Sequence, residues 1–310
     1  MNKTESNNGV ANLHFKNTDW VITKNGIEEK PIMDATGDRI PFEVKKTDPL
    51  LIINSKPDEK GNPHYSIRSG DLGLLIQCHF ARFLYNTSDF NWNVSFNKVS
   101  AIEPTLTNTH FISKCSAIGY LLYSGHDKDG TKAVIANEIP PDSGSVIGRT
   151  GKSLLAQAIS KMVPTVTVQG KRRDINTDRF LFECVDAGTK VVNIDDAKRN
   201  FNFENLFPFV GGDWIIKRKR KEDLIIPRES APKLYISTIN KIKGQGGSFD
   251  RRMHVITFSN YYNEKRSPRQ ELSIFFQDWD KNQWNLFYNF MANCIQIYFE
   301  HGLVASPQVK

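Results

Sequence analysis

Short apolar runs alternate with helical patterns along the chain from Lys132 onward. The apolar runs are KAVIANEI, VPTVTVQ, TKVVNIDD, PKLYISTIN and MHVITF. Runs of this length, rich in β-branched residues and separated by stretches of helical period, are typical of strands in a parallel sheet. The pattern predicts an α/β core in which helices flank a central parallel sheet.

Helical periodicity also precedes and follows this core. Apolar residues recur at three and four positions in residues 71–86 and 110–124, and the aromatic-rich residues 271–302 are helical in character as well. In the first seventy residues only DPLLIINS has the character of a strand. We therefore expect three parts. Residues 1–130 form a mostly helical N-terminal region that could serve as an accessory or oligomerisation element, residues 131–262 form the core, and residues 263–310 form a helical C-terminal segment.

The overall composition excludes some classes of protein. The chain has 310 residues, a formal net charge of +7 and an isoelectric point near 9.1, and a positive balance favours a polyanionic partner where the cations are concentrated. No stretch approaches the roughly 18 to 20 apolar residues of a membrane span, so we expect a cytoplasmic protein with no membrane partner. Its four cysteines are scattered without a CxxC pair, which favours reduced thiols over a zinc site.

A glycine-containing stretch, GSVIGRTGKS, lies between the first strand of the core and a helical stripe that begins at Leu154. Such a loop can bind nucleotide phosphate, because its backbone N–H groups and the amino end of the helix surround the anion, while Lys152 reaches the terminal phosphates and Ser153 holds Mg²⁺. Val146 stands where the pattern GxxxxGK[ST] has glycine, so a loop that contains GKS by coincidence is the alternative. The candidate ATP-binding residues are Gly148, Arg149, Thr150, Gly151, Lys152, Ser153 and Leu154.

Two acids end the third strand of the core, in the run VVNIDD. After a phosphate-binding loop, the first acid of such a pair, Asp195, can support Mg²⁺, and the second, Asp196, can orient and activate the attacking water. The alternative is ordinary, because apolar strands often end in a solvated or helix-capping acid.

Three further candidate residues lie near the ends of the last two strands. Asn240 ends PKLYISTIN, where its amide could contact the γ-phosphate or the attacking water, and the alternative is a turn residue. Arg251 and Arg252 begin the last strand, where arginine can stabilise charge on a transferring phosphoryl group, sometimes from a neighbouring subunit. The alternative for the arginines is a surface ion pair with Asp250.

Five consecutive cations lie between the acids and Asn240, in GGDWIIKRKRKEDLII. The two apolar triplets can pair as the arms of a hairpin after the GGD turn, and the cations would then lie at its tip and could bind a phosphate backbone. Because successive side chains alternate on paired strands, the five cations cannot all face one way, and we expect about half of them to lie on one side. A solvated loop is the alternative. The residues are Lys217, Arg218, Lys219, Arg220 and Lys221.

The ordered set GRTGKS, VVNIDD, GGDWIIKRKRK, YISTIN and DRRMHVITF resembles the superfamily 3 helicases, specifically the phage and plasmid relatives of the poxvirus-type primase-helicase. The resemblance covers roughly residues 130–260. In that family Walker A, Walker B, a GGD-led basic hairpin, a strand ending in an asparagine, and arginines before the last strand follow in this order. The resemblance implies an AAA+ P-loop core and a hexameric ring with ATP between subunits. It also implies hairpins that grip single-stranded DNA in the central channel.

These observations lead to two hypotheses about function. The first is an ATP- and Mg²⁺-dependent replicative DNA helicase of a phage or mobile element, located in the host cytoplasm. Its expected partners are single-stranded DNA and further copies of itself, and a primase or replication initiator is a further candidate partner. The second is a nucleotide-binding, DNA-binding or initiator-like module with weak or no ATPase activity. The intact pair of acids, the asparagine and the arginines favour the first hypothesis.

Overall fold

The computed structural model describes most of the chain: residues 9–32, 39–57, 63–68, 73, 77–90, 104–126, 130–138, 148–240, 242, 246–273 and 275–307. Two compact units divide it. One combines Met1–Tyr120 with Ser259–Lys310, and the other is Leu121–Phe258. The second unit contains most of the predicted core, and the predicted C-terminal segment belongs to the same unit as the N-terminal region.

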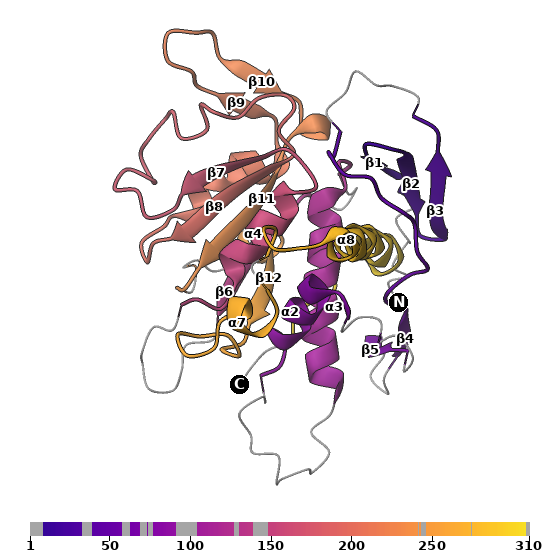
Figure 1. Ribbon diagram of the computed structural model, residues 1–310. Helices are drawn as coiled ribbons and strands as arrows, with labels where there is room; N and C mark the ends of the chain where they lie inside the picture. The colour runs from indigo at the N-terminus through magenta and orange to yellow at the C-terminus, as the bar shows by residue number, and fades with distance from the viewer. Residues whose placement is uncertain are drawn as a thin grey trace. The chain divides into compact units, whose positions relative to one another are not determined.

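A five-stranded, wholly parallel sheet forms the centre of the second unit (Figure 1). All five predicted apolar runs form strands of this sheet, so the predicted α/β class is confirmed. The order across the sheet is β12-β6-β11-β8-β7. The strands are β6 (Ala133–Glu138), β7 (Thr165–Gln169), β8 (Val191–Ala197), β11 (Lys233–Thr238) and β12 (Met253–Phe258).

Burial on both faces of the sheet explains why apolar residues are continuous along these strands rather than alternating with polar ones. Every residue of the central strand β11 is buried, as expected where both faces of a parallel sheet are covered. Helix α4 (Lys152–Ser160) packs against the sheet with Leu155 and Ile159 fully buried. The remaining elements of this unit are η1 (Phe203–Leu206), α5 (Phe207–Gly211), β9 (Trp214–Ile216), β10 (Leu224–Ile226), η2 (Arg228–Ser230) and α6 (Gly247–Asp250).

Parallel strands bring the candidate catalytic residues to one edge of the sheet. The P-loop follows the carboxyl end of β6, Asp195 and Asp196 lie at the carboxyl end of β8, and Asn240 follows the carboxyl end of β11. Because β11 lies between β6 and β8, all three strand ends are neighbours. This is the edge at which open α/β sheets generally bind ligands.

The first unit corrects the expectation that residues 1–130 are mostly helical. Among its described residues, five short strands occupy the first part: β1 (Ala11–His14), β2 (Asp19–Thr23), β3 (Gly26–Lys30), β4 (Ile53–Pro57) and β5 (Pro63–Ile67). They form a three-stranded antiparallel sheet and a separate two-stranded hairpin. Strands of four or five residues are too short to give a clear alternating pattern. The Asn25–Gly26 pair at the β2–β3 turn is the sequence feature that could have indicated an antiparallel hairpin here.

Helices are the main elements in the other described parts of the first unit. The prediction for 110–124 is confirmed, whereas within 271–302 the described helical residues are 271 and 281–301, so the expectation of helix across the described residues of 272–280 is wrong. The helices are α2 (His79–Asn86), α3 (Pro104–Leu122), whose last two residues fall in the second unit, α7 (Pro268–Glu271) and α8 (Lys281–His301). Asn289 and Asn293 of α8 bind the backbone of residues 45–51. Across the described parts of the chain, no helix combines the length and the apolar character that crossing a membrane requires.

Lys114, in α3, gives a pH-dependent prediction for stability. Its ammonium is fully buried, donates to Ser88 Oγ at 2.9 Å, and has its pKa lowered to about 7 by burial. Between about pH 7 and 10 the unfolded chain therefore binds more protons than the folded chain, so the free energy of unfolding should rise with pH in this range. Lys114→Met should remove this slope and stabilise the protein at pH 7 by roughly 1–4 kcal/mol. Urea unfolding at pH 7 and 9.5 measures both effects, with exposed Lys45→Met as the control; an unchanged slope would contradict the prediction.

Candidate functional site

The P-loop turns sharply into α4. Gly148 and Arg149 both have φ of 59°, and Gly151, the N-cap of α4, has φ of 100°. Gly151 is the position where glycine matters most, because this φ is strained for any residue with a Cβ. Gly144 and Val146 lie outside the described residues, so the departure at Val146 has no structural account here.

The donors of the P-loop converge on one carboxylate, that of Glu138 at the end of β6. Gly148 N donates to Glu138 Oε1 at 2.9 Å, and Thr150 Oγ1 donates to Glu138 Oε2 at 3.0 Å. Lys152 Nζ lies 2.5 Å from the same Oε2 and 3.1 Å from Thr150 Oγ1. The Lys152 and Glu138 side chains are only 9% and 5% exposed. Sequence reasoning treated Glu138 as a strand residue only, since nothing in the motif marks it.

Ser153 and Asp195 meet as predicted for an Mg²⁺ site. Ser153 Oγ donates to Asp195 Oδ1 at 2.8 Å, and Ser237 Oγ, from β11, donates to the same oxygen at 2.8 Å. Neighbouring ligands of an octahedral Mg²⁺ lie about 2.9 Å apart, and Mg²⁺ usually takes one or two carboxylates together with phosphates and waters. The oxygen pair therefore fits Mg²⁺. Ser237 was not predicted as a site residue, because it lies inside a buried strand and the motif marks only Asn240, beyond the end of that strand.

Asp196 lies next to Asp195 but faces different partners. It has φ of 57°, which turns the chain at the end of β8, and its backbone N–H donates to Ser237 Oγ at 2.8 Å. Its carboxylate lies 2.5 Å from Lys171 Nζ, and both side chains are substantially exposed. The left-handed backbone separates the two acids, so they can have different functions.

One residue of β11 and one residue that follows it complete this edge. Tyr235 is fully buried and donates its hydroxyl to Lys152 O at 2.8 Å, which anchors the first turn of α4. Burial raises the pKa of Tyr235 well above its usual range, and the charge of Asp195 adds to the shift, so the hydroxyl keeps its proton. Asn240 lies two residues beyond β11, where its backbone N–H donates to Thr238 Oγ1.

Gly170 shows how closely the backbones approach beside the acids. Its N–H donates to Asp195 O at 2.6 Å, and a Cβ at this position would come within 2.6 Å of Ala197 Cα. A side chain here would therefore push β7 away from β8, next to Asp196 and Lys171.

The two arginines lie at the opposite edge of the sheet. Met253 pairs with Ala133 and Phe258 pairs with Glu138, so the residues before Met253 lie at the amino ends of β12 and β6. The five residue steps from Ala133 to Glu138 separate the edges by roughly 17 Å. Neither arginine can reach the P-loop of its own chain without a large rearrangement.

The structure distinguishes the two arginines. Arg252 donates from Nη1 to Ser248 O at 3.0 Å and lies over the Phe207 ring at 4.6 Å, so it helps to hold α6. Arg251 is exposed, and its side chain forms no ion pair or hydrogen bond with the described residues. The ion pair with Asp250 that the sequence offered as an alternative is absent from this described region.

Strands β9 and β10 form the predicted antiparallel hairpin, with Ile215 opposite Ile225 (Figure 1). Trp214 and Ile216 are buried in the core, whereas Ile215 is 53% exposed. The five cations follow β9 but lie outside both strands, in the connecting loop. The expected alternation of their side chains is therefore wrong, because the strand pairing stops at Ile216.

The cations differ in how far their side chains are engaged. Lys217 Nζ lies 2.5 Å from an Asp223 carboxylate oxygen, and Arg218 Nε donates to Glu222 O at 2.8 Å. Lys219 Nζ lies over the Phe180 ring at 5.5 Å. Arg220, with φ of 57°, and Lys221 are exposed, and their side chains form no hydrogen bond, ion pair or ring contact with the described residues. They are the cations most available to a polyanion.

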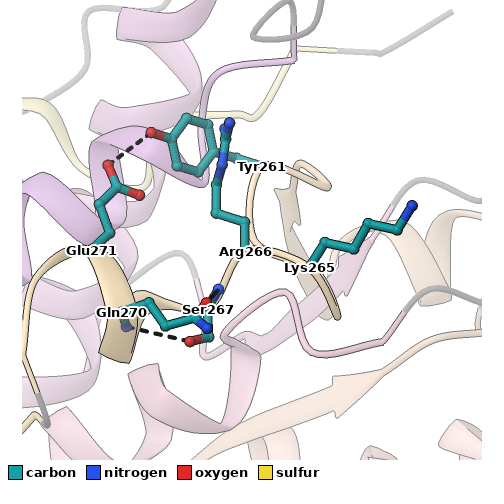
Figure 2. Close-up of a pocket in the computed structure, with 6 residues that line it drawn as sticks. All are labelled: Tyr261, Lys265, Arg266, Ser267, Gln270 and Glu271. Atoms are coloured by element: carbon teal, nitrogen blue, oxygen red, sulfur yellow. Dashed lines mark hydrogen bonds between the residues drawn. The ribbon is translucent and has the colours of Figure 1, made fainter.

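A shallow hollow of about 330 Å³ lies in the first unit (Figure 2). Tyr261 donates its hydroxyl to Glu271 Oε1 at 2.9 Å, and Arg266 lies over the Tyr261 ring. Ser267 and Gln270 bind each other as the capping box of α7. Figure 2 shows the Lys265 side chain extending away from the other five. The polar groups here largely bind one another, so their arrangement explains the local fold rather than a ligand.

Comparison with known proteins does not assign this chain to a family. No protein-family model matches it, and no curated protein matches it. Similar solved structures include two of the apo A form of the NrS-1 C-terminal region, both 13% identical, with TM-scores of 0.38 and 0.37. They cover 97% and 93% of this chain, which spans 67% and 66% of theirs. Another is JCV helicase with a bound thiazolopyridine-phenoxy acetamide, at 12% identity, TM-score 0.30, and coverage of 73% of this chain and 60% of that one.

Proposed function

We propose that this chain is the ATP-hydrolysing motor of a ring-shaped replicative DNA helicase of a phage or mobile element, which moves on single-stranded DNA. The main support is the arrangement at the carboxyl edge of the sheet, where Ser153, Asp195 and the P-loop donors meet. This set offers donors for phosphate and oxygen ligands for Mg²⁺ within one site. Membership of superfamily 3 and the hexameric ring remain parts of this proposal.

Each residue of the site has a distinct task in the proposed reaction. Lys152 neutralises charge on the terminal phosphates, and Gly148 and Thr150 supply further donors to the same oxygens. Ser153 and Asp195 would hold Mg²⁺, which would supply positive charge to the phosphates. Asp196 accepts a proton from the attacking water, and Asn240 orients that water or the γ-phosphate. Proton transfer to Asp196 requires its carboxylate to move away from the Lys171 ammonium.

Arg251 supports assembly as a ring. A group at the amino edge cannot reach the P-loop of its own sheet, but a second copy could present its Arg251 to that P-loop. An exposed arginine without a partner in the described region is available for such a contact, where it would stabilise the charge of the transferring phosphoryl group. In this arrangement the ATP site is complete only between two subunits.

The alternative, a nucleotide-binding module without efficient hydrolysis, also has support. Glu138 engages the P-loop donors, and Lys171 engages the proposed base. Phosphate release by the purified protein with ATP and Mg²⁺, measured with and without single-stranded DNA, separates the two functions. We expect turnover that DNA stimulates. Tight ATP binding with no turnover under either condition would instead support the alternative.

The hairpin cations give a prediction for DNA binding. Replacing Arg220 and Lys221 together by alanine should weaken single-stranded DNA binding and flatten the plot of log affinity against log salt by about 1.4 per engaged subunit, because each lost phosphate contact lowers the slope by about 0.7. Basal ATP hydrolysis should persist, since the hairpin lies outside the phosphate site. Fluorescence anisotropy over a range of salt concentrations measures the slope.

The matched control for the hairpin is Lys161→Ala with Arg269→Ala, two exposed cations outside it that give the same change in net charge. If both double variants have the slope of the wild type, the hairpin cations form a solvated loop. DNA binding would then require another basic segment, with residues 171–173 the next candidate.

A further inference from the structure

The Glu138 carboxylate occupies the position of an anion in the P-loop. Three chemically different donors reach it: a backbone N–H from Gly148, a hydroxyl from Thr150 and the ammonium of Lys152. These are the kinds of donor that bind phosphate oxygens in a nucleotide site. The two carboxylate oxygens divide the donors between them, as two oxygens of a phosphate could.

Burial makes this contact energetically important. Glu138 and Lys152 are each almost fully shielded from water, and breaking a buried pair by removing one partner leaves an unpaired charge. A triphosphate that enters the loop would place its own negative charge beside Glu138. The carboxylate and the phosphate cannot accept hydrogen bonds from the same N–H and ammonium groups at full strength, so binding of one disfavours the other.

We propose that Glu138 is an internal anion that holds the P-loop in the absence of nucleotide, and that a nucleoside triphosphate binds by displacing it. This inference rests on the proposed nucleotide site. It makes Glu138 a determinant of affinity: it keeps Lys152 and Thr150 ordered, and it lowers the affinity for any ligand that carries phosphate. Glu138 forms no hydrogen bond with Ser153 or Asp195 in the described structure, so the proposed Mg²⁺ ligands can stay in place during the exchange.

Binding of a fluorescent ATP analogue tests this inference. Glu138→Gln keeps the size of the side chain and an amide oxygen for the donors but removes the competing charge. We expect this variant to bind the analogue about tenfold more tightly than the wild type, a change of about 1.4 kcal/mol. Inorganic pyrophosphate should compete with the analogue more effectively in the variant, because the effect depends on the phosphates and not on the base. A merely structural role for Glu138 would give the opposite sign, since a less ordered P-loop binds phosphate less tightly.

Two further variants keep the test decisive. Glu229→Gln removes an exposed carboxylate of the same unit and should leave affinity unchanged. Glu138→Asp keeps the charge but shortens the side chain by one methylene, so its carboxylate should hold the donors less well and its affinity should lie between those of the wild type and Glu138→Gln. If thermal melting shows that Glu138→Gln does not fold, the aspartate variant carries the test.

The possible outcomes separate this inference from the proposed function. If the wild type binds the analogue and Lys152→Ala does not, while Glu138→Gln binds no more tightly than the wild type, the inference about Glu138 is overturned and the nucleotide site stands. If neither the wild type nor either Glu138 variant binds the analogue or pyrophosphate, both the inference and the proposed function are overturned.

Discussion

Lys152→Ala should reduce DNA-stimulated ATP hydrolysis by at least roughly 10²–10³-fold, because the ammonium stabilises charge that develops on the terminal phosphates. The structure adds a second cause. Without the ammonium, the buried Glu138 carboxylate loses its counter-charge and repels an incoming triphosphate. Release of phosphate from ATP, with and without single-stranded DNA, measures the loss. Unchanged turnover would remove the P-loop assignment.

Two comparisons make the Lys152 result interpretable. Lys161→Ala removes an exposed cation from the end of the same helix and should leave turnover unchanged. Thermal melting should show a fold that is retained but less stable, since removing one partner of a buried ion pair costs about 3–5 kcal/mol. Combining Lys152→Ala with Glu138→Gln should recover much of that stability without restoring hydrolysis.

Arg251→Ala should reduce turnover by roughly 10³-fold or more if the arginine completes the site of a neighbouring subunit. ATP binding by the isolated subunit should persist, because the P-loop is at the other edge of the sheet. Mixing this variant with Lys152→Ala should restore part of the activity, since a mixed interface can combine an intact P-loop with an intact arginine. Absence of rescue at every mixing ratio would contradict action between subunits.

Arg252→Ala is the matched control for Arg251. Arg252 lies over the Phe207 ring and binds Ser248 O, so its loss should lower stability by about 0.5–2 kcal/mol and affect turnover much less. The sequence could not distinguish these neighbours. A larger loss of turnover from Arg252→Ala than from Arg251→Ala would reverse the assignment.

The sequence predicted those residues of the candidate site that occupy a defined position in a motif. The contact between Ser153 and Asp195 follows from a P-loop and an acid-ended strand in a parallel sheet, and local pattern is enough to place both. Glu138, Ser237 and Tyr235 were not predicted as site residues. Ser237 and Tyr235 lie within an apolar strand, and their contacts depend on which elements are neighbours across the sheet, which periodicity does not encode. Glu138 ends an apolar strand, and nothing in the motif predicts that the P-loop donors reach back to it.

The sequence by itself determined the strands of the core, helix α4, the β9–β10 hairpin and which residues are candidates for the proposed site, because apolar period, glycine positions and strand-end acids are local properties. Only the tertiary structure decided the order β12-β6-β11-β8-β7, which places β11 between the P-loop strand and the strand that ends in the acids. It also decided that the arginines lie at the far edge, because the register of β12 on β6 joins residues far apart in the chain. The contacts of Glu138 with the P-loop donors span only 10 to 14 residues, but they depend on how the P-loop folds back onto the end of β6, which local pattern does not encode.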